Sequence, residues 1–152
     1  MHMTRKVQNA LKPVSNEHNH SLLLCWKIDT GFRKNIEPER IKRYADWFFI
    51  NRIQPHFDME EKFIYPILGL KHQLIKQAVA QHKRLSRLFQ AFDNIEKSLR
   101  QIMEELEHHI RFEERVLFKE IQNIATQEQL DRIVINHNYD YFQENTRDIF
   151  WS

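Results

Sequence analysis

Residues that break helices are rare in this chain. Only two Gly and four Pro occur among its 152 residues, so long segments run without a residue that would end a helix. No segment shows the sustained alternation of polar and apolar residues that marks a half-buried strand. This composition argues against a β fold and predicts an all-α chain.

Cysteine is nearly absent as well. Cys25 is the only one, which excludes an internal disulfide and is typical of a reducing compartment, so we expect a cytoplasmic protein. The first 19 residues are polar and lack the apolar core of a signal peptide. No apolar run approaches the length needed to cross a bilayer, and we therefore expect no membrane partner.

An excess of charge of one sign is also missing. The 23 Lys and Arg residues are interspersed with 21 Asp and Glu, and the formal net charge is +2. Without a basic stripe, the sequence predicts no nucleic-acid partner. The 152 residues, with 11 Phe and three Trp, are enough for one domain with a large aromatic core.

Apolar residues recur at helical spacing between short breaks. The pattern predicts helices over residues 15–29, 38–65, 73–92, 93–124 and 127–145, after a tail that ends at Pro13. Pro55 lies inside the second helix and should kink or unwind it just before His56. We expect a single domain, residues 1–152, formed by a largely antiparallel four-helix bundle over about 14–124 and a short extra C-terminal helix.

An H-x-x-x-E pattern occurs twice, as His56 with Glu60 and as His109 with Glu113. Four residues advance an α-helix by about 400°, so each His stacks on its Glu on one helix face. That face carries the apolar stripe: Ala45, Phe49, Ile53, His56, Glu60, Phe63 and Ile67 in one helix, and Leu99, Ile102, Leu106, His109, Glu113, Val116 and Leu117 in the other. Because Glu is rarely buried unless it is paired, this placement indicates a cation in the core.

Two further His residues lie on apolar stripes. His82 shares a face with Ile75, Val79 and Phe89, and His18 aligns with Leu22, Cys25 and Phe32. Facing helices of a bundle build metal sites in this way. Imidazole with carboxylate favours iron or manganese, although zinc is also accepted, and six donors indicate two metal ions with each Glu able to bridge them.

The segments EHNHSLLLCWKI, PHFDMEEKFIYP, QHKRL and HHIRFEERVLF resemble the hemerythrin-like (HHE cation-binding) family over about residues 14–124. The resemblance implies an up-and-down four-helix bundle around a non-haem centre of two iron ions. Its ligand pattern falls on six residues, of which Glu60 and Glu113 would bridge the irons: His18, His56, Glu60, His82, His109 and Glu113.

The chain departs from the oxygen-carrying members of that family at one position. Those members place a second His one turn after the His of the third helix, where this chain has Ser86. The resemblance therefore implies one imidazole fewer and an open coordination position, for which we expect water or a small ligand.

The remaining titratable residues near the pattern are expected to lie outside the ligand set. His20 is about 200° round the helix from His18, and His108 about 100° from His109, so both are predicted at the surface or a helix boundary. His137 is kept as a candidate for the missing ligand. Glu61 and Glu114 are predicted to be solvent-facing charges.

Three functions remain open at this point. The first is a protein that binds or senses a small diatomic ligand, oxygen or nitric oxide, at the open position. The second is an enzyme or repair factor, such as a ferroxidase, a peroxide reductase or an iron donor for iron–sulfur cluster repair. The third, a metal-free interaction module, would require the stacked His and Glu to be exposed, against the apolar stripes. The sequence does not predict an oligomeric state.

Overall fold

The computed structural model describes residues 5–137 and 142–152, with side chains from residue 10 onward. Within these ranges every regular element is helical and no strand occurs, which confirms the all-α prediction. None of the helices in the described ranges combines the length and the hydropathy needed to cross a bilayer.

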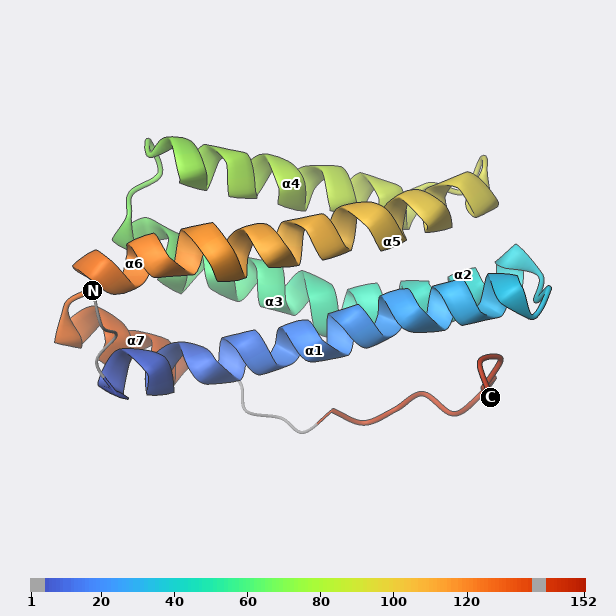
Figure 1. Cartoon of the computed structure of the whole chain (residues 1–152), viewed down its shortest axis with the longest axis horizontal. Helices are drawn as coiled ribbons and strands as arrows, with labels where there is room; N and C mark the ends of the chain where they lie inside the picture. Colours follow the sequence, from blue (N-terminus) through green and yellow to red (C-terminus); the bar gives the residue numbers. More distant parts are fainter. Residues whose placement is uncertain (1–4, 138–141) are drawn as a thin grey trace.

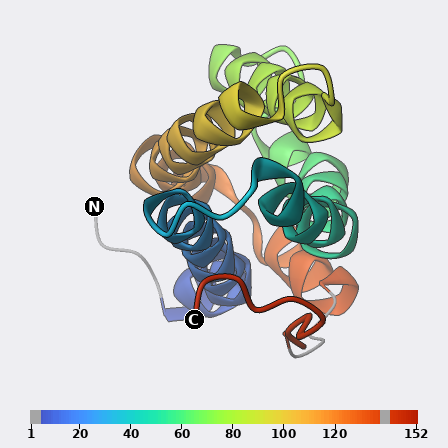
Figure 2. The same cartoon turned by 90° about the vertical axis from the view of Figure 1, so that its right-hand side faces the viewer.

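The helices form four long rods with similar axes (Figure 1). The first rod is α1 (Arg5–Arg33) and the third is α4 (Gln73–Gln90). The second rod joins α2 (Pro38–Phe48), η1 (Phe49–Ile53), α3 (Gln54–Met59), η2 (Glu60–Ile64) and η3 (Tyr65–Ile67). The fourth joins α5 (Ile95–Phe112), η4 (Glu113–Leu117) and α6 (Phe118–Ile124). The view along the rods shows them around a common interior (Figure 2).

The start of α1 corrects the sequence prediction of a tail up to Pro13. The helix begins at Arg5, and Ala10, Leu11 and Val14 are buried in an apolar cluster. The same cluster contains Leu130 and Ile133 of α7 (Gln127–Asn136), which lies beside α1. Pro13 costs a helix about 3 kcal/mol. Apolar burial against a helix more than 100 residues later in the chain offsets this cost, and no local pattern reveals it.

The predicted C-terminal helix is correct at its start and wrong at its end. Thr126 forms a capping box with Gln129, as expected, but α7 ends at Asn136 instead of about residue 145. Residues 138–141 lie outside the described ranges. Residues 142–152, which we call the C-terminal strap, are not helical and run along α1 and α2 (Figures 1 and 2).

The C-terminal strap is held by charges and by one buried ring. Asp148 accepts two hydrogen bonds from the guanidinium of Arg40, at 2.9 and 2.7 Å. Glu144 pairs with the buried ammonium of Lys27, which also donates to Tyr44 Oη at 2.7 Å. Phe150 is buried in the core cluster. These side-chain contacts hold the segment in place, although its sequence lacks helical periodicity.

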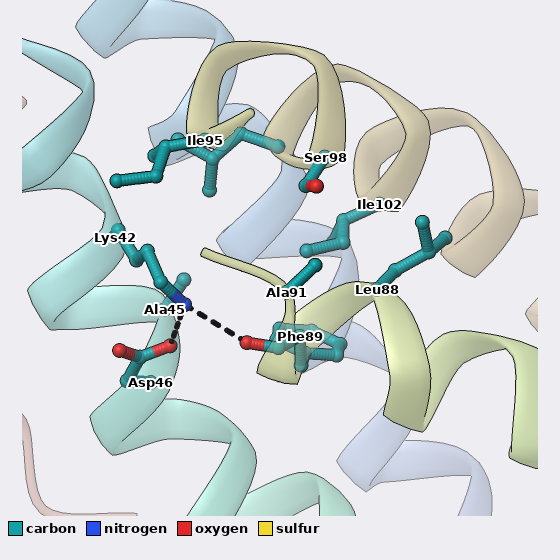
Figure 3. Close-up of a pocket in the computed structure, with 10 residues that line it drawn as sticks. Lys42, Ala45, Asp46, Leu88, Phe89, Ala91, Ile95, Ser98 and Ile102 are labelled. Carbon is teal, nitrogen blue, oxygen red and sulfur yellow. Dashed lines mark hydrogen bonds and ion pairs between the residues drawn. The ribbon is translucent and has the colours of Figure 1, made fainter. Parts of the chain in front are cut away.

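The end of α4 is fixed by a lysine from the neighbouring rod. Lys42 Nζ donates to Phe89 O at 3.0 Å and to Asp46 at 2.8 Å (Figure 3). A cation at a helix C-terminus satisfies a carbonyl that has no partner within the helix and complements the helix dipole.

The core is divided into two apolar clusters. In each rod the change from one cluster to the other occurs around a His or an H-x-x-x-E pair: between Val14 and Leu24, between Phe57 and Ile64, between Ala78 and Leu85, and between Ile110 and Leu117. Apolar packing on both sides therefore brings a layer of polar side chains together in the middle of the bundle.

We predict that Gly31→Ala destabilises the protein. A Cβ at Gly31 would lie 2.7 Å from Ile41 Cδ1 and 2.9 Å from Phe150 Cε1. The side chains of Ile41 and Phe150 are both buried. Helix propensity alone favours Ala over Gly by up to about 1 kcal/mol, whereas overpacking costs about 1–3 kcal/mol. Denaturant unfolding measures the balance. A stabilised Gly31→Ala variant would contradict the close docking of the strap, and Thr30→Ala serves as a control.

Candidate metal centre

All six residues of the predicted ligand set come together in the polar layer. The Nε2 or carboxylate atoms form two groups, each with its atoms within 4.8 Å of one another: His18, His56, Glu60 and Glu113 in one, and Glu60, His82, His109 and Glu113 in the other. Every member is buried. Two His residues are particular to each group, and both carboxylates are common to the two groups.

Each shared glutamate begins a π-helical turn. Glu60 O accepts from the backbone N–H of Tyr65, and Glu113 O accepts from that of Phe118, five residues later in both cases. A π turn inserts one residue into the helix and often occurs at functional sites. It rotates the residues that follow, so Tyr65 and Phe118 lie in the interior. The same rotation explains why Val116, predicted on the buried stripe, is 41% exposed.

The glutamates that directly follow Glu60 and Glu113 in the sequence hold the rings of His82 and His18. Glu114 Oε1 lies 2.6 Å from His18 Nδ1, and Glu61 Oε2 lies 2.7 Å from His82 Nδ1. The side chains of Glu61 and Glu114 are 41% and 36% exposed and belong to neither donor group, as predicted, but each also orients a histidine ring, which the sequence did not reveal. Because a carboxylate only accepts, each His donates from Nδ1 and turns Nε2 toward the interior.

The rings of His56 and His109 are held by the residues that directly precede His18 and His82 in the sequence. Glu17 Oε2 lies 3.1 Å from His56 Nδ1, and Gln81 Oε1 lies 2.5 Å from His109 Nδ1. All four rings thus have an oxygen partner outside and Nε2 inside, an arrangement that is typical of metal-binding histidines. The sequence carries this signal as E-H, Q-H and twice as H-x-x-x-E-E, but none of these short patterns is specific alone.

Tyr65 is a further polar residue of the site that the sequence analysis missed. Its hydroxyl donates to Glu113 Oε2 at 2.5 Å and lies 3.0 Å from His82 Nε2. Its ring stacks on His82, as the ring of Phe118 stacks on His18. Tyr65 and Phe118 therefore occupy matching places in the two halves, and a hydroxyl is present in only one of them.

Charge balance in the metal-free site requires protons. Burial alone would lower the pKa of His18 and His82, but ion pairs with a buried glutamate and a partly exposed one raise the pKa of each to about 9. Burial, together with the charge of Glu113, raises the pKa of Glu60 well above its usual range. The neighbouring histidines outweigh burial at Glu113, whose pKa is lowered. Without a cation, protons on these groups would limit the repulsion between the two carboxylates.

Several buried donor atoms still have no hydrogen bond. Within the described ranges these include His56 Nε2, His109 Nε2 and both carboxylate oxygens of Glu60. His56 Nε2 is 3.4 Å from Glu60 Oε1, although the pair does not form a hydrogen bond. Buried polar atoms without partners are costly, and atoms of this kind aimed at one another fit metal ions. The residues present therefore fit a metal centre of nitrogen and oxygen donors.

The other residues considered from the sequence lie elsewhere. His20 stacks on Phe142, and His108 is exposed. His137, the candidate for the missing ligand, belongs to neither donor group, and its Nε2 bonds to Glu17. Leu22, predicted on the inner face with His18, is 37% exposed. His18 lies near the edge of the buried face of α1, and Leu22 falls about 40° beyond it.

Comparison with known protein families gives one match. The model of the hemerythrin HHE cation binding domain matches residues 9–118, a range that includes all six residues of the two groups. Neither a curated protein nor a solved structure matches the chain.

We predict that the metal-free protein loses stability as the pH rises from about 6.5 to about 9. A histidine whose pKa is raised on folding contributes stability that is complete below its unfolded pKa and is lost as the pH passes its folded pKa. His18 and His82 both follow this rule. Thermal melts across this range, with and without metal, measure the effect. A constant or rising midpoint for the metal-free protein would contradict the ion pairs of these two histidines.

Proposed function

Because the chain belongs to the hemerythrin HHE cation-binding family, we propose that it holds two iron ions in the middle of the bundle. One ion would be bound by His18 and His56 and the other by His82 and His109. Glu60 and Glu113 would bridge the two ions. The observation that carries this proposal is that both carboxylates belong to both groups of buried donors.

Iron is the metal that the donor set favours. Each position offers two imidazoles and two carboxylates, a mixture that suits iron or manganese better than a thiolate metal, and zinc remains acceptable. The proposal includes a single domain over residues 1–152 with an up-and-down antiparallel four-helix topology, which the course of the rods in Figure 1 supports. A cytoplasmic location is supported by the single free thiol of Cys25.

We further propose that the protein binds or senses a small diatomic molecule, oxygen or nitric oxide. The bound iron pair would supply the redox chemistry and a coordination position. The chain supplies a dry, closed site, since the six donor residues are at most 6% exposed and apolar clusters lie on both sides. Exclusion of water protects a reactive metal centre from side reactions.

The small ligand would bind on the side of His18 and His56. On the other side the Tyr65 hydroxyl lies beside His82 Nε2. There it can occupy the coordination position that we expected to be open because the chain has Ser86 in place of a second His. The matching residue on the first side is Phe118, whose ring packs on His18 and offers no donor. The position without a hydroxyl is therefore the one that remains open.

The hydroxyl that the described residues place next to the ligand set is poorly suited to serve as the acid of an enzymatic reaction. Tyr65 is the additional hydroxyl next to the ligand set, and burial with the charges of Glu60 and Glu113 raises its pKa far above the usual value. A group of that kind holds its proton and is a poor general acid. Binding is therefore favoured over turnover.

We predict that Glu60→Ala and Glu113→Ala each reduce the metal content from about two ions per chain to one or none, because a bridging carboxylate holds both ions. Glu104→Ala, an exposed change in α5, should keep both ions. Metal analysis after gel filtration and circular dichroism of the same samples provide the measurement and the control for folding. Full metal content in both core variants would contradict the bridging role.

A pair of matched substitutions tests the open position. Phe118→Tyr places a hydroxyl beside His18 and should weaken nitric oxide binding to the reduced iron protein by about tenfold, or ~1.4 kcal/mol. Tyr65→Phe removes the hydroxyl on the other side and should raise the number of nitric oxide molecules bound per chain from one to two. Titration followed by visible absorption measures both. Unchanged affinity in Phe118→Tyr at full iron content would assign the ligand to the other ion.

A further inference from the structure

Glu17 joins a histidine of the metal centre to the end of α7. One oxygen of its carboxylate lies 3.1 Å from His56 Nδ1, and the other accepts from His137 Nε2. We call this chain of contacts the Glu17 tether. Its polar atoms lie within the fold, because His56 and His137 are 6% and 8% exposed.

His137 stands at the boundary of the helix that packs beside the bundle. Its backbone N–H bonds to Ile133 O at 2.9 Å and so closes the last turn of α7. Leu130 and Ile133 anchor the helix in the apolar cluster with the start of α1. The side chain of His137 thus adds a directional polar contact to the apolar contacts of Leu130 and Ile133.

The Glu17 tether breaks the match between the two halves of the site. At the corresponding place the ring of His109 is held by Gln81, a neutral amide of α4. An amide therefore suffices to orient such a ring. The carboxylate of Glu17 does more, since its second oxygen reaches His137 at the end of α7.

The tether also borders a small pocket next to the metal centre. The pocket holds about 70 Å³ and is lined by Glu17, Asn51, Arg52, Pro55, His56, Met59 and His137. This volume admits a few water molecules. Because His137 forms part of the wall, movement of the end of α7 would widen the pocket and let water compete for His56 Nδ1.

We propose that His137 is a positioning residue that couples the docking of α7 to metal binding at the His18–His56 position. The proposal rests on the metal centre proposed above and assigns a regulatory element to it. Metal at that position fixes the ring of His56, which fixes Glu17 and holds His137. Coupling of this kind is reciprocal, so an undocked α7 weakens the same metal position. Within the described residues, no such link reaches the position held by His82 and His109.

Hydrogen exchange of the full chain tests one direction of the coupling. Loading with Fe²⁺ under anaerobic conditions should slow amide exchange in residues 127–137 by about fivefold or more, the lower end of usual coupling between sites. His137→Leu should remove this protection, and His137→Gln should restore much of it, because the Gln amide can donate to Glu17 in place of Nε2. His108→Gln, at an exposed position, is the control.

Release of iron to a chelator tests the other direction. In His137→Leu one of the two ions should leave about fivefold faster or more while the other keeps its rate, and His137→Gln should return the first rate toward that of the wild type. A variant that loses both ions faster by the same factor would overturn the proposal, since it reports general loosening. Equal release in wild type and His137→Leu would overturn it too.

The wild-type exchange measurement separates this proposal from the one on which it rests. A protein that binds two ions without any response in residues 127–137 overturns the coupling and leaves the metal centre in place. A protein that takes up no metal overturns both.

Discussion

Two carboxylates buried side by side are the constraint on which the rest of this structure depends. Glu60 and Glu113 are 0% exposed and belong to both groups of buried donors. Removing a carboxylate from water costs several kcal/mol even after the protein relaxes. In the metal-free protein, protonated histidines and a raised pKa at Glu60 limit this cost. Two metal ions would remove it altogether and leave the four imidazoles neutral.

The surrounding structure orients the donors around that pair. π turns start at both carboxylates, and the oxygen partners on all four Nδ1 atoms turn the Nε2 atoms inward. The two halves match closely in these respects. They differ at Tyr65 against Phe118 and at Glu17 against Gln81, and these differences make the two proposed metal positions chemically unequal. The proposed functions of the two positions follow from those differences and not from the shared ligands.

The sequence predicts which side chains meet in the polar layer because these residues recur at helical spacing. H-x-x-x-E within an apolar stripe places His and Glu on one buried face, and the same stripe logic selects His18 over His20. It fails where contacts are distant in sequence. The burial of Ala10 and Leu11 depends on α7, the ordered strap depends on Lys27 and Arg40, and the roles of Glu61 and Glu114 depend on rings from other rods. Inserted π turns have no local signature, which is why Val116 was placed on the wrong face and Tyr65 was missed.

The central claim is that two metal ions share Glu60 and Glu113. Anomalous diffraction from crystals of protein purified with its native metal, collected on both sides of the iron absorption edge, tests it most directly. The account predicts two iron peaks, one between His18 and His56 and one between His82 and His109, with both carboxylates reaching both peaks. A single peak, or two peaks that do not share these carboxylates, would contradict it.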